Sequence, residues 1–211
     1  LRKFTVAEAD KQGLLGFAAA FSGDGGFAGA PGGTARAGTA YLFDLETGQK
    51  TFTLTPSMAK TNDMFGFNAA MSGQKVLVID PGNPFHTTKV KGAAYVFDVQ
   101  TGTELARLHP NDGFDGDEFG FGINLHDNLG IMGAPNLGAG RGAAYLFDIE
   151  TGSQLLRLTP SDSFDGDEFG FDVAVNEDYA VVGAPRNYDT VGFVKGAVYV
   201  FDTQTGQQIH R

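Results

Sequence analysis

Short runs in which apolar and polar residues alternate recur along the whole chain, with turn residues between them. This period of two predicts strands at 154–158, 171–175, 179–184 and 197–201. The longest nearly apolar run, residues 14–21, is far shorter than the ~20 residues that a membrane-spanning helix needs. The pattern therefore predicts an all-β chain without membrane insertion.

One sequence unit recurs four times, and each copy contains a Gly-x-x-Tyr-x-Phe-Asp-x-x-Thr-Gly segment. The tyrosines of these segments are separated by 54, 50 and 54 residues. We therefore expect a single domain, 1–211, made of two double repeats, 1–104 and 105–208. The recurring tyrosines are Tyr41, Tyr95, Tyr145 and Tyr199. The Phe-Gly-Phe motif occurs at 65–67, 119–121 and 169–171, and 15–17 reads Leu-Gly-Phe. The Gly-Ala-Pro motif occurs at 29–31, 133–135 and 183–185, and 79–81 reads Ile-Asp-Pro.

Four-stranded units of roughly 50 residues, repeated radially, predict a four-bladed β-propeller. The repeat overlaps at the two ends of the chain, because Ile209-His210-Arg211 aligns with Leu1-Arg2-Lys3. We expect Leu1–Thr5 to pair with 197–201 and close the ring, since the C-terminal copy lacks the second apolar residue of this strand.

Composition limits the classes of function. The formal charge of −10 and the pI near 4.7 argue against nucleic acid as a partner. The chain has no cysteine, which excludes disulfides, a thiolate nucleophile and cysteine-bound metals. The composition does not set the oligomeric state.

Phe-Gly followed by Gly-Ala-Pro at this spacing resembles the FG-GAP repeat, the blade unit of integrin α-subunit propellers. Residues 142–185 are also similar to the bacterial branch of these repeats. The resemblance implies a propeller at the cell surface or outside the cell, used in adhesion or ligand recognition. Integrin blades carry a calcium loop between strands one and two, but here that hairpin is short, as in 176–178, so this site is not carried over.

Two acidic loops, 112–118 and 162–168, each place four carboxylates within seven residues around a glycine. Such a set suits a hard cation, so calcium is one interpretation and a solvated turn is the other. The candidate calcium ligands are Asp112, Asp115, Asp117, Asp162, Asp165 and Asp167.

Two longer insertions, 82–91 and 186–195, join strands two and three of the second and fourth units. Because strand direction reverses at each hairpin, these insertions are expected on the same face as the acidic loops. They carry aromatic and basic residues suited to ligand recognition, although packing over the blade edges is the alternative. The candidate ligand-binding residues are Phe85, His86, Lys89, Arg186, Tyr188, Phe193 and Lys195.

The sequence contains no common catalytic motif, and its four histidines occupy different repeat positions. We therefore expect a non-enzymatic, extracellular or cell-surface recognition module for a protein or glycan, with possible assistance by calcium as its cofactor. A structural spacer in a larger adhesin is the alternative. A polysaccharide-active enzyme using Glu118 or Glu168 is a third reading.

Overall fold

The computed structural model describes residues 5–6, 13–32, 37–58, 63–82, 92–113, 116–187 and 194–211. These residues form four antiparallel sheets of four strands each, and every sheet keeps its strands in chain order. The strands are β1 (Ala19–Ser22), β2 (Gly25–Ala30), β3 (Thr39–Asp44) and β4 (Lys50–Leu54); β5 (Ala69–Ser72), β6 (Lys75–Asp80), β7 (Ala93–Asp98) and β8 (Glu104–Leu108); β9 (Ile123–His126), β10 (Leu129–Ala134), β11 (Ala143–Asp148) and β12 (Ser153–Leu158); and β13 (Val173–Val175), β14 (Tyr179–Ala184), β15 (Ala197–Asp202) and β16 (Gln208–His210).

The four sheets confirm the predicted repeat unit, and each is called a blade here, numbered one to four in chain order. β14 begins and ends where the apolar pattern predicts, and β13, β15 and β12 differ from their predicted bounds by at most two residues at either end. Each blade has a β-bulge at the same place in its outer strand pair, next to Phe43, Phe97, Phe147 or Phe201. The repeat in sequence is therefore also a repeat in backbone geometry.

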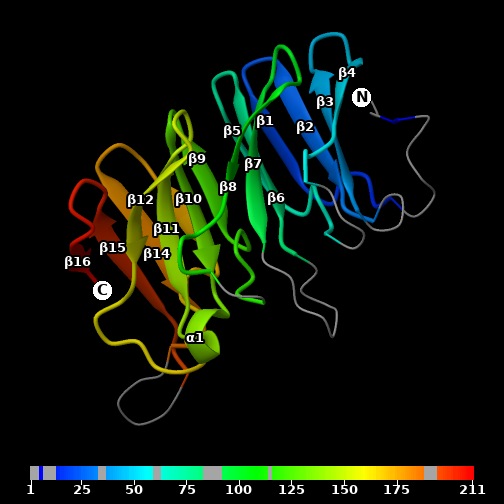
Figure 1. Ribbon diagram of the computed structural model, residues 1–211. Helices are drawn as coiled ribbons and strands as arrows, with labels where there is room; N and C mark the ends of the chain where they lie inside the picture. The colour runs from blue at the N-terminus through cyan, green and yellow to red at the C-terminus, as the bar shows by residue number, and fades with distance from the viewer. Residues whose placement is uncertain are drawn as a thin grey trace.

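The blades stand side by side in a row, with the first strand of each blade on the inner side (Figure 1). β1 contacts β5, β5 contacts β9, and β9 contacts β13. Within the described residues β1 and β13 do not pack together in this way, and Figure 1 shows their blades at opposite ends of the row. The fold is thus an all-β, propeller-like stack of four blades in which closure into a ring is not seen.

The strand that completes blade four comes from the C-terminus. β16 pairs with β15, with His210 opposite Val200 and Gln208 opposite Phe201. The prediction that Leu1–Thr5 fills this position is therefore wrong, and residues 1–4 themselves lie outside the described part. The apolar anchor missing from the C-terminal copy is offset by backbone pairing and by Arg211, whose guanidinium forms an ion pair with Asp162.

The core lies between the blades. The first phenylalanine of each Phe-Gly-Phe motif is buried and meets aromatic rings of its own blade edge-on, as Phe169 meets Tyr199 and Phe201 with centroids 5.5 and 5.8 Å apart. The second phenylalanines form a row across the blades, with successive centroids at 5.1, 6.4 and 4.7 Å. The row of second phenylalanines thus contributes to the contact between blades.

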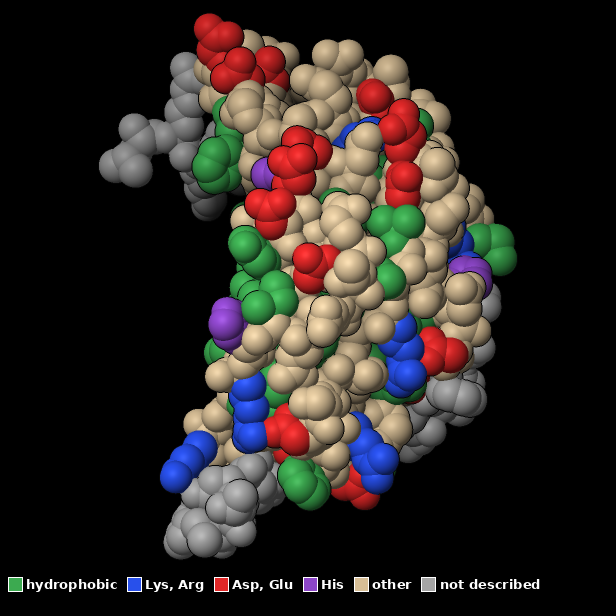
Figure 2. Space-filling view, turned by 90° about the vertical axis from the view of Figure 1, so that its left-hand side faces the viewer, with side chains coloured by type: hydrophobic (Ala, Val, Ile, Leu, Met, Phe, Trp, Pro, Cys, Tyr) green, Lys and Arg blue, Asp and Glu red, His purple; other side chains and the backbone are tan. Residues whose placement is uncertain are grey.

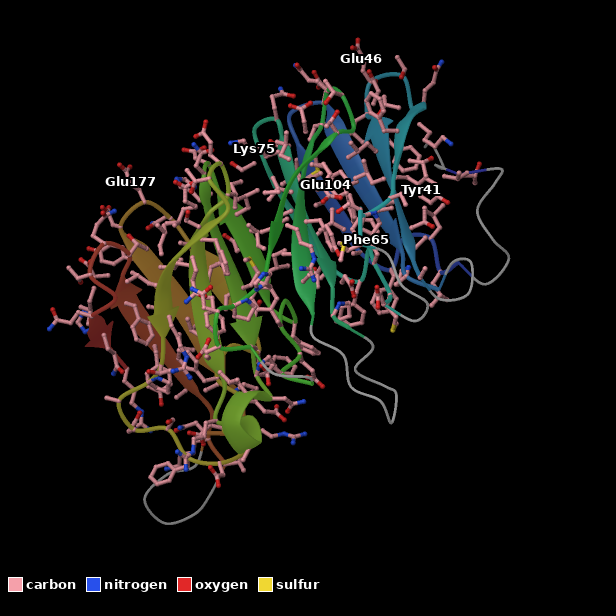
Figure 3. All side chains as sticks on the ribbon, viewed as in Figure 1. Tyr41, Glu46, Phe65, Lys75, Glu104 and Glu177 are labelled. Atoms are coloured by element: carbon pink, nitrogen blue, oxygen red, sulfur yellow. The ribbon has the colours of Figure 1, made fainter. Side chains whose placement is uncertain are left out.

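The two ends of every sheet differ. One end, the hairpin face, carries the turns between strands one and two and between strands three and four; Figure 3 shows Glu46, Lys75 and Glu177 there. The other end, the loop face, carries the links between blades, the loops between strands two and three, and the single turn α1 (Leu137–Gly140). Among the described residues, no helix has the length and apolar character needed to cross a bilayer.

Candidate functional site

The acidic loop 162–168 lies beside the end of β14 on the loop face, as the strand directions predict. The side-chain amide of Asn187 donates a hydrogen bond of 2.9 Å to Asp167 Oδ2. The guanidinium of Arg186 lies 2.9 Å from a carboxylate oxygen of Glu168. These contacts fix the second acidic loop against the start of the long insertion.

The same loop also reaches blade three. The backbone N–H groups of Gly166 and Glu168 donate to the carbonyl oxygens of Ala139 and Gly140, at 3.1 and 2.8 Å. Arg141, directly after α1, places its Nε 2.6 Å from Asp165 Oδ1. The acidic loop therefore joins two blades, and the short turn α1 is the feature of blade three that meets it.

A polar cluster lies beneath this loop, at the outer edge of blade four. The hydroxyl of Tyr199 donates to Asp162 Oδ1 at 2.9 Å, and Arg211 donates to Asn187 Oδ1 at 2.8 Å while pairing with Asp162. Burial, and next the hydrogen bond with Asp162, raise the pKa of Tyr199 far above its usual range. The hydroxyl is therefore protonated at neutral pH and acts as a donor.

Similar contacts occur in the preceding blades. Arg157 lies 3.1 Å from Asp112 in blade three, and Arg107 donates to the hydroxyl of Tyr95 at 3.3 Å in blade two. These contacts recur at equivalent positions of the repeat, where they hold the outer strand of a blade against its third strand or against the loop that leads to the next blade. A structural role is enough to explain them. We therefore interpret the polar cluster as structural.

Asp167 is fully buried, and one of its carboxylate oxygens is well bonded. Oδ2 accepts the amide of Asn187 and, at 2.8 Å, the backbone N–H of Phe164. The other oxygen, Oδ1, has no hydrogen-bond partner. This oxygen is the one feature of the second acidic loop that a cation would explain.

Other acidic side chains of this loop have cationic partners within the protein, and calcium binding there stays a prediction. Asp162 and Asp165 are each paired with an arginine. In the described part of the chain, no group of three or more acidic or histidine side chains is placed to hold a metal ion. In the first loop, Asp112 pairs with Arg157, Asp117 is buried, and Asp115 lies outside the described residues, so calcium there stays a prediction.

The predicted ligand-binding residues are only partly described. Arg186 and Lys195 lie on the loop face at the two ends of the second insertion. The others fall outside the described residues, and their role stays a prediction: Phe85, His86, Lys89, Tyr188 and Phe193.

Sequence reasoning missed Phe164, which projects from the second acidic loop with 61% of its surface exposed. Its position in a tight acidic turn was the available signal, because an apolar side chain there has no strand or helix to pack against. The contribution of Arg141 was also missed, since it depends on a contact between two blades.

The turns of the hairpin face are more alike from blade to blade than the loops of the loop face. In its Asp-x-x-Thr-Gly turns the aspartate accepts the threonine backbone N–H, at 2.7 Å for Asp44 with Thr47 and for Asp202 with Thr205. Two cavities of about 470 and 360 Å³ open here, between blades one and two and between blades three and four. Figure 2 shows acidic side chains gathered toward this end, whereas most of the visible Lys and Arg lie toward the loop face.

Comparison with known families agrees with this architecture. The FG-GAP repeat family matches residues 103–147 and 153–201, each of which runs from the outer strand of one blade to the third strand of the next. A search of curated proteins gives no match to the chain. The chain thus carries FG-GAP repeats in these two segments, and all four of its blades have the same strand order.

Proposed function

We propose that this protein is a non-enzymatic recognition module, outside the cell or at its surface, that binds a protein or glycan ligand through its loop face. FG-GAP repeats support the general part of this proposal, because they are typical of extracellular or surface proteins. The specific part rests on the loop face, where loops are held by a rigid β scaffold, the usual setting for recognition residues.

The observation that carries the proposal is the exposed ring of Phe164 on a loop that hydrogen bonds hold in place. Its ring is exposed, whereas its backbone N–H is bound to buried Asp167 and its neighbour Asp165 is bound to Arg141 of blade three. An exposed aromatic ring on an ordered loop can stack on a sugar ring or pack against a protein side chain at little entropic cost.

The difference between the two faces supports the same conclusion. The hairpin turns repeat one hydrogen-bond pattern, as Asp44 and Asp202 show, which is what the fold alone requires. The loops vary from blade to blade, with α1 in blade three and a longer insertion, 186–195, in blade four. Variation on a constant scaffold supports recognition through the loop face.

Binding to a glycan array and to candidate proteins tests this proposal. We expect Phe164→Ala to weaken binding at least about tenfold, because a central exposed ring typically contributes more than 1 kcal/mol. The matched control is Leu155→Ala, which removes an apolar side chain of similar exposure (49%) from β12 and is expected to bind as the unchanged chain does. Tyr188→Ala and Phe85→Ala extend the test to the two insertions.

A folded chain that binds no glycan or protein would favour the alternative of a structural spacer in a larger adhesin. The second alternative, a polysaccharide-active enzyme, would use Glu168, whose carboxylate is already paired with Arg186. Release of reducing sugar ends from polysaccharides, abolished in Glu168→Gln, would support that alternative and contradict the non-enzymatic proposal.

A further inference from the structure

The two cavities on the hairpin face are copies of one feature of the repeat. Every residue that lines the smaller cavity, between blades three and four, has its repeat equivalent in the lining of the larger one, between blades one and two. Leu129 of the smaller cavity corresponds in this way to Gly25 of the larger one, and each begins the second strand of its blade. The same space therefore recurs where consecutive blades meet at this face.

At the junction between blades two and three, a side chain of the protein spans this space. The repeat equivalent of Leu129 there is Lys75, the first residue of β6, which Figure 3 labels. Its Nζ reaches the hairpin of blade three and donates a hydrogen bond of 2.7 Å to Asn128 Oδ1. The side-chain amide of Asn128 donates in turn to Glu150 at 2.8 Å. A lysine is thus the protein's own occupant of one such junction.

The charge of this lysine also acts on a carboxylate of blade three. The pKa of Asp148 lies below its usual value, first because the backbone N–H of Thr151 donates to it, and the ammonium group of Lys75 contributes to the same shift. Asp148 also lines the smaller cavity. The hairpin end of a blade junction is therefore an environment that stabilises an ammonium group.

The smaller cavity has the chemistry of this junction but contains no lysine of its own. Its volume is about 360 Å³, and Asp127, Asp148 and Glu177 contribute carboxylates to its lining. Leu129, at the position of Lys75, gives it an apolar wall. Among the described residues that line it, none is a lysine or an arginine, and His126 lies 3.9 Å from Asp127.

An ammonium group on an apolar stem fits this lining better than a metal ion does. The methylene groups of a lysine pack readily along apolar surface such as that of Leu129, while the charged end stays in contact with water. In the described residues, no group of three or more acidic or histidine side chains converges closely enough to hold a metal ion. A flexible stem with a compact charge does not need ligands that converge on one point.

The larger cavity offers less to the same group. Gly25 provides no apolar wall there, and blade two contributes Gly73 at the position that Glu177 occupies in blade four. Its carboxylates, Asp24 and Asp44, both come from blade one. Only the smaller cavity combines an apolar wall with carboxylates from both blades.

We propose that the cavity between blades three and four binds a lysine side chain of a partner protein, at the place where Lys75 lies between blades two and three. The stem of this lysine lies along Leu129, and its ammonium group lies between Asp148 of blade three and Glu177 of blade four. The acidic side chains gathered on this face (Figure 2) favour the approach of a basic surface. The site is on the opposite face from the loops of the proposed function and does not depend on that proposal.

A short peptide with a single lysine tests the site on the full chain. We expect titration with the end-blocked peptide Gly-Gly-Lys-Gly-Gly to shift the NMR signals of the backbone amides of 126–129 and 177. The same peptide with norleucine keeps the stem but lacks the ammonium group, and it should bind at least about fivefold more weakly. Raising the ionic strength should weaken binding of the lysine peptide, because the cavity is open to solvent.

The first variant supplies the cavity with its own lysine. Leu129→Lys gives blade three the residue that blade two has at position 75, so the new side chain occupies the cavity and repels a second ammonium group. Binding of the lysine peptide should fall at least about tenfold. Leu129→Met is the matched control, because it has a stem of similar length without the charge, and it should bind as the unchanged chain does.

A second variant leaves the apolar wall intact. Glu177→Gln removes one exposed carboxylate from the cavity and should weaken binding about two- to fivefold. Its control is Glu46→Gln, which removes a charge from an exposed residue of the same face that lines neither cavity, and which should leave binding unchanged. Far-ultraviolet circular dichroism verifies the fold of each variant.

Several results would overturn the proposal. One is a titration in which the lysine peptide shifts no signal of the residues that line the cavity. Another is equal binding of the lysine and norleucine peptides. Equal binding by Leu129→Lys and Leu129→Met, or equal losses in Glu177→Gln and Glu46→Gln, would show that the lysine does not occupy this cavity.

Discussion

Gly133 of blade three lies against the carbonyl oxygen of Gly170 in blade four, with no space for a Cβ atom between them. This contact lets two sheets approach until their backbones touch, which a larger residue at position 133 prevents. We expect Gly133→Ala to lower the free energy of unfolding by about 3 kcal/mol or more, because the rigid backbone on the other side cannot yield as a side chain can.

Urea unfolding measures this loss. Gly29→Ala, in the equivalent contact with Gly66, should cause a similar loss. Unchanged stability in both variants would mean that the blades do not approach this closely.

Phe169 is the second test of the contact between blades. Its ring is completely buried, beside Tyr199 of its own blade and in one core cluster with Leu158 of blade three. Phe169→Ala should therefore cost about 3–5 kcal/mol of unfolding free energy. The matched control is Phe164→Ala, which removes an exposed ring five residues earlier and should change stability by less than about 0.5 kcal/mol. Similar losses in the two variants would contradict the placement of these rings.

Removal of residues 208–211 tests the outer strand of blade four. The deletion eliminates the pairing of β16 with β15 and the contacts of Arg211 with Asp162 and Asn187. We expect thermal unfolding to show a loss of about 2 kcal/mol. Arg211→Ala keeps the strand but loses a half-exposed ion pair and the hydrogen bond to Asn187, so its loss should be about 1 kcal/mol, smaller than that of the deletion. A deletion variant with the same melting temperature as the full chain would show that β16 does not contribute to stability.

Calcium titration separates the two acidic loops. Asp162 and Asp165 are held by arginines, so we expect Asp165→Asn to leave the melting temperature in calcium and in EGTA as in the unchanged chain. A calcium-dependent rise that disappears in Asp165→Asn would contradict this expectation. A rise that persists there but disappears in Asp115→Asn would assign the ion to the first of the two loops for which the sequence predicts calcium.

The hairpin turns give the protein a pH dependence in acid. The backbone N–H of Thr47 and then its hydroxyl lower the pKa of Asp44 below 3.8. Thr205 lowers the pKa of Asp202, and Thr151 that of Asp148, also chiefly through the backbone N–H. A carboxylate whose folded pKa is depressed stabilises the fold above the unfolded pKa, and this contribution is lost as pH falls through the folded pKa.

We therefore expect unfolding free energy to be level from neutral pH to about pH 5 and to decline below about pH 4 through these groups. Replacing Asp44, Asp148 and Asp202 together by Asn keeps an acceptor oxygen but removes the charge. Urea unfolding at neutral pH and at pH 3 should show a smaller acid loss in the triple variant. An identical acid loss would contradict a role for these turns.

Local patterns explain why much of the fold could be predicted. The bounds of β14 follow from the alternation of apolar and polar residues in 179–184, which needs no knowledge of the rest of the chain. The turn at Asp202 and Thr205 follows in the same way from side chains that bond to their own backbone. Burial of Phe169 could be predicted because its motif recurs with the blade.

The site was predicted less completely, because its contacts join segments far apart in the sequence. The placement of loop 162–168 beside Arg186 followed from strand direction alone. The pairing of Arg141 with Asp165 depends on how the α1 turn meets the next blade, and this pairing weakens the case for calcium. Acidic spacing alone does not show which carboxylates already have cationic partners.

The sequence by itself determined the number of blades, their strand order and the glycines and phenylalanines through which they meet. Only the tertiary structure decided that β16 completes blade four and that, within the described residues, β1 and β13 do not pack together as the first strands of neighbouring blades do. Gly133 and Gly183 occupy the same repeat position. A Cβ atom on Gly133 would overlap the backbone of blade four, whereas the nearest described atom to a Cβ on Gly183 is the carbonyl oxygen of Asp172, 3.6 Å away in its own blade. The physical reason is that a repeat specifies each contact surface locally, whereas the presence of a neighbour depends on where whole blades stand in space.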